Sequence, residues 1–107
     1  MRIARESVQT PAESMSTSTS APTKVPFGNV YQGTVQIRSG SITTLTFYTS
    51  DDNGLTWAPG YDDNGTALSR SVKAVPSSLP IPTALVGAGW IGLVADQAAV
   101  FSLNLKS

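Results

Sequence analysis

The chain has 107 residues, with seven basic and seven acidic side chains and with no histidine or cysteine. This composition excludes disulfide bonds, thiolate chemistry, metal sites built on His or Cys, and every Ser/His or Cys/His catalytic arrangement. Charged residues make up only 13% of the chain, well below the roughly 25% of ordinary soluble domains. Such a weakly charged chain suits a protein that buries much of its surface against neighbours.

Basic residues do not cluster, because the densest group is Arg2 and Arg5 near the start of the chain. A nucleic-acid partner is therefore not expected. No stretch of about 20 apolar residues occurs, so no membrane-spanning helix is expected either. The first residues lack the apolar segment of a secretory signal, so we expect the chain to be made in a cytoplasm and not to be exported by that route.

Residues 7–24 are rich in Ser, Thr and Pro and nearly lack large apolar side chains. Such a segment buries too little surface to offset the entropy lost on ordering. The sequence therefore predicts an extended arm over residues 1–29 and a folded domain over residues 30–107. We expect a chain without residues 1–26 to fold.

Two strands are predicted at the start of the domain. Residues 34–38 alternate, with Val35 and Ile37 on one face. A short turn over residues 39–41 follows. Residues 42–49 are rich in β-branched and aromatic side chains and form the strongest predicted strand, with Leu45 and Phe47 sharing a face.

Two turns with the same four residues, Asp-Asp-Asn-Gly, occupy positions 51–54 and 62–65. Asn-Gly pairs favour positive φ and mark hairpins. We predict a short strand over residues 55–57 between the turns, and a longer one over residues 67–75. Three prolines within residues 76–82 predict irregular structure there, and Pro82 is placed to start one helical turn through Leu85.

The last two predicted strands cover residues 90–95, which read as buried, and residues 98–106, which alternate. Strands of this number and spacing are typical of a β-sandwich or small barrel. The predicted fold is all-β: a small antiparallel, jelly-roll-like β-sandwich of six to eight strands with an extended N-terminal arm.

The sharpest local motif runs from Ser50 to Trp57 and matches the Asp-box pattern Ser-x-Asp-x-Gly-x-Thr-Trp at every fixed position. The role of these residues is to stabilise the hairpin. Asp52 is expected to bind backbone N–H groups of the turn, Gly54 to take positive φ, and Trp57 to pack across the hairpin base. Asp boxes recur in sialidase-like propellers, but one copy in a chain this short cannot build a propeller.

Other interpretations of the acids are weaker. Asp51, Asp52, Asp62 and Asp63 could offer oxygen ligands to Ca²⁺, but their spacing does not match an EF-hand loop. A glycosidase needs two carboxylates across a cleft, whereas these acids, and Asp96, lie in predicted turns. We therefore predict no enzyme, no catalytic residue, no cofactor and no metal. Four aromatic residues, Tyr48, Trp57, Tyr61 and Trp90, could also form a glycan platform, although aromatics in so small a domain are usually core.

From about Thr43 onward the chain resembles small proteins encoded among the structural genes of tailed bacteriophages. The resemblance is carried by residues 45–57, 60–65, Leu79-Pro80 before Trp90, and residues 101–107. It implies a β-sandwich virion protein of the head-decoration, head-fibre or capsid-stabilising type, with no catalytic residues. Implied partners are the major capsid protein or other virion proteins, and further copies of the chain. The expected location is the virion, assembled in the host cytoplasm. A glycan-binding adhesion module is the alternative.

Overall fold

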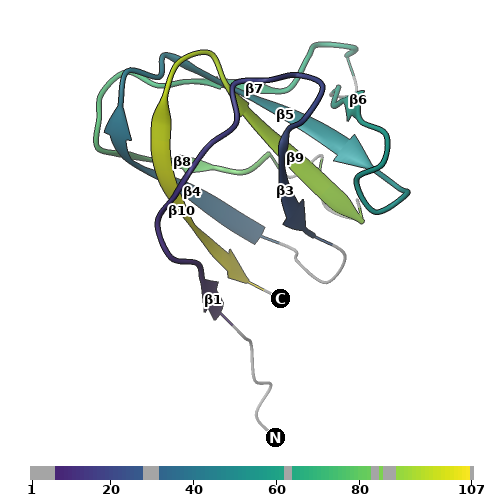
Figure 1. The fold of residues 1–107 in the computed structure, drawn as a ribbon, viewed down its shortest axis with the longest axis horizontal. Coiled ribbons are helices and arrows are strands. Elements are labelled where there is room, and N and C mark those ends of the chain that lie inside the picture. Colours follow the sequence, from purple (N-terminus) through teal and green to yellow (C-terminus); the bar gives the residue numbers. More distant parts are fainter. Residues whose placement is uncertain (1–6, 28–31, 62–63, 83–84, 86–88, 107) are drawn as a thin grey trace, which may run out of the picture.

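The computed structural model describes residues 7–27, 32–61, 64–82, 85 and 89–106. The described residues form ten strands in two antiparallel sheets that pack face to face (Figure 1). The predicted all-β sandwich is thus confirmed, although it has more strands than the six to eight expected. Among the described residues, no helix is long and apolar enough to cross a membrane.

The first sheet contains β1 (Ser7–Gln9), β2 (Glu13–Ser14), β4 (Gln32–Gly40), β8 (Ser77–Pro80) and β10 (Ala99–Lys106). Its order is β1-β10-β4-β8, with β2 also pairing with β10. We call it sheet A. Strands β10 and β4 lie at its centre and pair over eight residues, with an irregularity between Val100 and Phe101.

The second sheet contains β3 (Thr23–Pro26), β5 (Thr44–Ser50), β6 (Ala58–Pro59), β7 (Ser69–Ser71) and β9 (Trp90–Ala95). Its order is β3-β9-β5-β6, with β7 also pairing with β5. We call it sheet B. The predicted strands over residues 34–38, 42–49, 90–95 and 98–106 correspond to β4, β5, β9 and β10, the four central strands of the sandwich.

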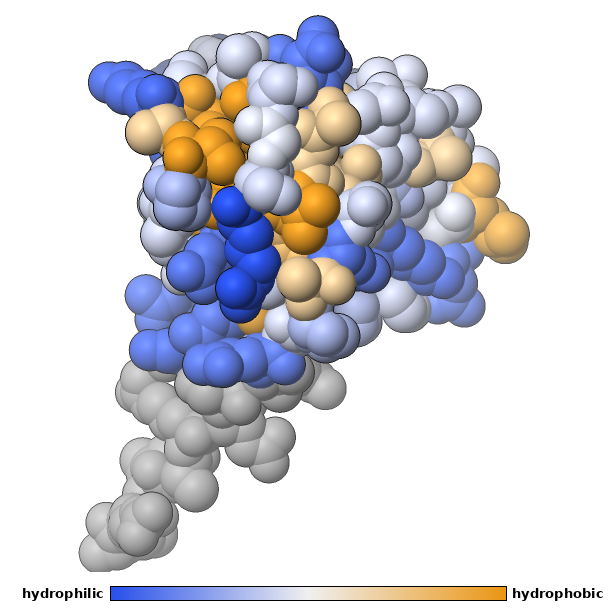
Figure 2. Space-filling view, turned by 60° about the vertical axis from the view of Figure 1, so that its left-hand side comes forward, coloured by the Kyte–Doolittle hydropathy of each residue, from blue (hydrophilic) through white to orange (hydrophobic). Residues whose placement is uncertain are grey.

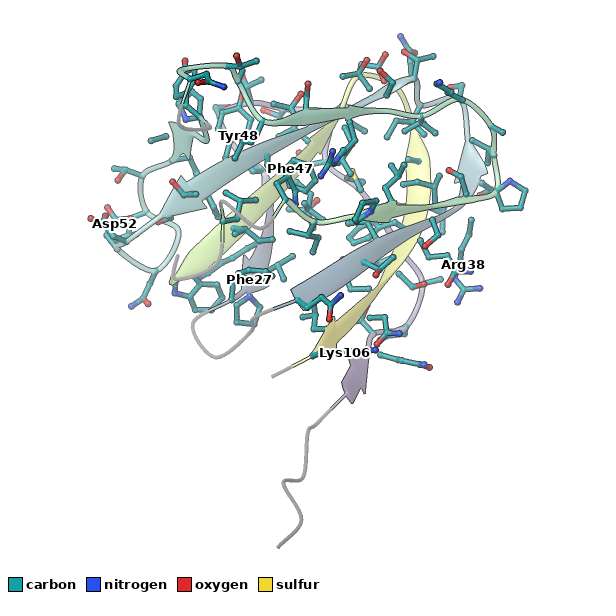
Figure 3. The ribbon with its side chains drawn as sticks, turned by 180° about the vertical axis from the view of Figure 1, so that it is seen from behind. Phe27, Arg38, Phe47, Tyr48, Asp52 and Lys106 are labelled. Atoms are coloured by element: carbon teal, nitrogen blue, oxygen red, sulfur yellow. The ribbon has the colours of Figure 1, made fainter. Side chains whose placement is uncertain are left out.

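The core lies between the sheets and follows the alternation read from the sequence. Val35 and Ile37 of β4 are fully buried, as are Leu45 and Phe47 of β5. Phe47 points between the two layers (Figure 3). The largest fully buried side chains are Phe27, Phe47, Phe101, Ile37, Leu45, Ile91, Leu93 and Val35. Because both sheets contribute to this set, the hydrophobic contact between the sheets is what stabilises the sandwich.

The N-terminal segment over residues 7–27 is built into both sheets. Strands β1 and β2 pair with β10, and β3 pairs with β9 (Figure 1). The segment is extended, as predicted, but its described part pairs with its own domain. Its apolar content is low, yet Met15, Val25 and Phe27 are all buried in the core.

This arrangement reverses the expectation for truncation. Removing residues 1–26 would leave the outer edges of β10 and β9 unpaired and would take Met15 and Val25 out of the core. Each lost apolar side chain costs about 2–5 kcal/mol when replaced by a cavity. Since a domain of this size is only marginally stable, the truncated chain is expected to unfold.

The prediction of irregular structure over residues 76–82 is wrong for residues 77–80, which form β8 on β4. Proline is excluded from central strands because it lacks an N–H, but it is tolerated where that N–H would point to solvent. Strand β8 is such an edge strand. Farther on, the N–H of Leu85 donates to the Pro82 carbonyl at 3.1 Å, and residues 83–84 lie outside the described part.

Three smaller predictions also differ from the structure. Residues 55 and 56 form bends, residue 57 has no regular structure, and the chain pairs with β5 at Ala58 and Pro59. The strand expected over residues 67–75 is limited to β7, because β5 divides its outer edge between β6 and β7. The turn predicted over residues 39–41 starts later, since β4 continues to Gly40, where φ is +123°.

Candidate functional site

The Asp-box hairpin between β5 and β6 has the internal bonding that the motif predicts. The Asp52 carboxylate accepts hydrogen bonds from the Thr56 N–H at 3.0 Å and from the Thr56 hydroxyl at 2.5 Å. The Ser50 hydroxyl donates to Asp52 at 2.7 Å and accepts from the Gly54 N–H at 2.9 Å. Gly54 has a φ of +83°. The motif's polar groups therefore bind one another and the loop backbone.

These bonds also set the charge of Asp52. The Thr56 hydroxyl, the Thr56 N–H and the Ser50 hydroxyl all donate to the carboxylate and lower the pKa of Asp52 to about 2. Bonds to the charged form favour ionisation. Figure 3 shows Asp52 at the tip of the hairpin, at one end of the sandwich and away from Phe47. A carboxylate that stays ionised down to pH about 2 is poorly suited to general acid catalysis.

Trp57, the last residue of the motif, packs on the outer face of sheet B. A Cβ placed on Gly92 of β9 would lie 2.8 Å from the Trp57 ring and 2.6 Å from Pro22. A Cβ on Gly54 would lie 3.2 Å from the same ring. The indole therefore covers the bare backbone of Gly92, beside the N-terminal segment. A glycine inside a buried strand is a signal for such close approach.

A second contact joins the hairpin to β9 and β3. The Trp90 indole N–H donates to the Asn53 side-chain oxygen at 3.0 Å, and the Lys24 ammonium lies 4.3 Å from the Trp90 ring centroid. Asn53 has a φ of +62°, a conformation that asparagine tolerates better than most residues. The Asp box thus fastens the hairpin, β9 and the N-terminal segment together. No pattern in the sequence indicates the contacts made by Lys24 and Asn53.

Asp96 serves another turn in the same way. Its carboxylate accepts from the Thr43 hydroxyl, from the Thr43 N–H at 2.9 Å and from the Thr44 N–H at 3.0 Å. These bonds, with the Thr43 hydroxyl contributing most, lower the pKa of Asp96 to about 2. Asp96 therefore ties the turn after β9 to the start of β5.

The acids do not gather into a site within the part of the chain that the structure describes. No group of three or more potential metal ligands occurs among those residues. Asp62 and Asp63, two of the four acids considered for Ca²⁺, lie outside the described residues. An open pocket of about 380 Å³ beside the hairpin is lined by Asp51, Thr56, Trp57 and Gly89, among others. Among the residues that the structure describes, Asp51 is the one carboxylate that lines it, whereas glycosidases use two.

The aromatic residues considered for glycan binding are dispersed. Tyr48 is half-buried on β5, and Trp57 and Trp90 are half-buried against Gly92 and Lys24. Tyr61 is 57% exposed and pairs with Ala67 in an isolated bridge. The structure therefore places Trp57 over Gly92 of β9 and Trp90 at the start of that strand, but both rings pack against the protein itself.

Sequence reasoning missed a small polar pocket on the outer face of sheet A. This pocket of about 90 Å³ is lined by Gln9, Gln36, Arg38, Ser102 and Asn104, among others. The Arg38 Nε donates to the buried Ser102 hydroxyl at 3.0 Å. Figure 3 shows Arg38 and Lys106 on the outside of this sheet. Strand alternation could place these residues on one face, but only the pairing of β1, β10 and β4 brings them together.

Comparisons of the chain with protein-family models, with curated proteins and with solved structures found no match.

Proposed function

We propose that the chain is a non-enzymatic structural protein of a tailed-phage virion. It decorates or stabilises the capsid, or anchors a head fibre, through its β-sandwich, into which the N-terminal segment over residues 7–27 is built. Its partners are the major capsid protein or other virion proteins, together with further copies of itself. Nucleic acid and membrane are not among its partners.

The observation that carries this proposal is that carboxylate and hydroxyl side chains, which could otherwise take part in catalysis, bind the protein's own turns. Asp52 and Asp96 each hold a turn through three hydrogen bonds from neighbouring residues. Ser50 is buried and bonded to the same hairpin. A domain whose polar side chains hold its own loops rigid is suited to an assembly, in which each subunit keeps one shape.

The surface supports the same proposal. The view in Figure 2 shows hydrophilic and hydrophobic residues intermixed, with the apolar ones mainly in the upper part and at the right-hand edge. Non-obligate protein interfaces have this mixed character and are depleted in charge at their centres. Many identical copies, each with a modest interface, would attach firmly because binding at several sites reinforces itself.

The direct experiment is mass spectrometry of purified phage particles produced from the genome that encodes the chain. We expect the chain in the particles at a copy number set by capsid symmetry. Its absence from intact particles, while the chain is abundant in the lysate, would reject the proposal. A Gln36→Glu variant then tests docking through sheet A, and Tyr61→Ser serves as a surface change outside that sheet.

The glycan-binding alternative depends on Tyr61, whose ring is the most exposed of the four aromatics considered. A glycan array with the full chain, repeated with Tyr61→Ser, distinguishes the two proposals. Binding that disappears in the variant would favour the glycan-binding function.

A further inference from the structure

The prolines of this chain follow the edges of the two sheets. All seven, Pro11, Pro22, Pro26, Pro59, Pro76, Pro80 and Pro82, lie in an edge strand or within three residues of one. The four central strands, β4, β5, β9 and β10, contain none. Unpaired edge strands invite pairing with other chains, and proline is one of the ways in which proteins prevent it.

The position of each proline along its strand decides whether it blocks pairing. In an antiparallel ladder, alternate residues direct their N–H and C=O toward the partner strand, and the others direct theirs away. Just after β3 the N–H of Phe27 donates to the Gly89 carbonyl, so the backbone N–H and C=O groups of odd-numbered residues point toward β9. The backbone groups of Lys24 and Pro26 therefore point outward. Pro22 is also even-numbered, which leaves the Lys24 N–H as the single outward donor between two prolines.

Strand β8 repeats this arrangement on sheet A. The N–H of Ile81 donates to the Gly33 carbonyl at 2.9 Å, so the backbone groups of odd-numbered residues point toward β4 and those of even-numbered residues point outward. Pro76, Pro80 and Pro82 are all even-numbered. The Pro80 carbonyl accepts from the Arg70 Nε at 3.2 Å, so this acceptor is also occupied. The Ser78 N–H is the one outward donor between Pro76 and Pro80.

The remaining edges are short or interrupted. In β6 the Gly60 N–H donates to Phe47, which places Pro59 outward. Pro11 lies between β1 and β2, where the register on β10 shifts by one residue. Strand β7 has only three residues, with the cation Arg70 at its centre. Within the described part of the chain, no edge thus presents a long, uninterrupted row of N–H groups.

We propose that these outward-facing prolines close both sheets to strand addition, so that the domain meets its partners through the faces of the sandwich and not by extending its sheets. The inference concerns the isolated chain and stands whether or not the chain belongs to a virion. It identifies a protective role for Pro26 and Pro80 that their packing alone would not require.

The test restores the missing donors in the full-length chain. Pro80→Thr and Pro26→Thr each add one outward N–H, and a double variant adds one to each sheet. Ser78→Thr is the matched control, because it makes a similar rise in β-propensity on the same edge without adding a donor. Sedimentation velocity over a concentration series measures self-association. Hydrogen exchange reports whether the new amide at position 80 becomes protected.

We expect the proline variants, but not Ser78→Thr, to form dimers and larger species as concentration rises, with the new amide protected in them. Circular dichroism shows whether each variant is folded. Should Pro80→Thr unfold, Pro80→Ala supplies the same donor with a smaller side chain. A folded double variant that sediments like the wild type at every concentration would overturn the proposal, as would equal association of Ser78→Thr.

Discussion

The indole of Trp57 lies directly on the backbone of Gly92, where an added Cβ would stand 2.8 Å from the ring. Trp57 ends the Asp box, and Gly92 is in the middle of β9, next to the N-terminal segment. In this chain the motif therefore packs a hairpin against β9 at a position without a side chain, beside Pro22 of the N-terminal segment.

Gly92→Ala is therefore expected to destabilise the protein. The added methyl group would collide with Trp57 on one side and Pro22 on the other, and overpacking of this kind costs about 1–3 kcal/mol. Urea unfolding followed by tryptophan fluorescence measures the change. Gly89→Ala is the control, because its Cβ would meet only the Ser50 carbonyl at 3.8 Å. Equal midpoints for the two variants would contradict this account.

Stability should fall in acid because of Asp52 and Asp96. Both carboxyl groups have a pKa of about 2 in the folded chain, against an ordinary value of 3.8. A lowered folded-state pKa stabilises the fold at pH values above the ordinary pKa, and this stabilisation disappears as pH falls through the folded value. We expect the urea midpoint to drop between pH about 4 and pH about 2. The Asp52→Asn/Asp96→Asn variant should show a smaller drop, and an unchanged drop would assign the acid sensitivity to other groups.

Met15 tests whether the N-terminal segment is part of the core. Its side chain is buried immediately after β2, and its N–H donates to the Ala99 carbonyl at 2.9 Å. Met15→Ala should lower the free energy of unfolding by about 2–5 kcal/mol, as at other buried sites. Thr17→Ala, at an exposed position of the same segment, should have little effect. If both variants unfold at the same urea concentration, the segment does not contribute to the core.

The bond from Trp90 to Asn53 should appear as a coupling between two positions. Trp90→Phe removes the donor. Asn53→Gly removes the acceptor but retains the positive φ that Asn53 adopts. Each single change should cost about 0.5–1.5 kcal/mol, and the double variant should cost less than their sum. Strict additivity in chemical denaturation would show that the two side chains do not interact in solution.

Much of the fold is readable from the sequence because its central strands carry strong local signals. Alternation identifies Val35, Ile37, Leu45 and Phe47 as core residues, and all four are fully buried. The Asp box can be predicted equally well, because its hydrogen bonds lie within one short loop and join Ser50, Asp52, Gly54 and Thr56. In both cases the residues that interact are close in sequence, so the pattern contains the reason for the structure.

The edges of the sandwich were decided only by tertiary structure. Strands β1, β2 and β3 have few apolar residues and gain their stability by pairing with β9 and β10, far along the chain. Strand β8 contains a proline, which reads as a break until β8 is known to be an edge. The contacts of Trp57 with Gly92, and of Lys24 with Trp90, likewise join segments distant in sequence. The sequence by itself therefore determined the centre of each sheet and the hairpin turn, because short-range patterns dictate them. Pairing across the chain determined the edges, because a strand with little apolar surface forms only where another strand already offers its hydrogen bonds.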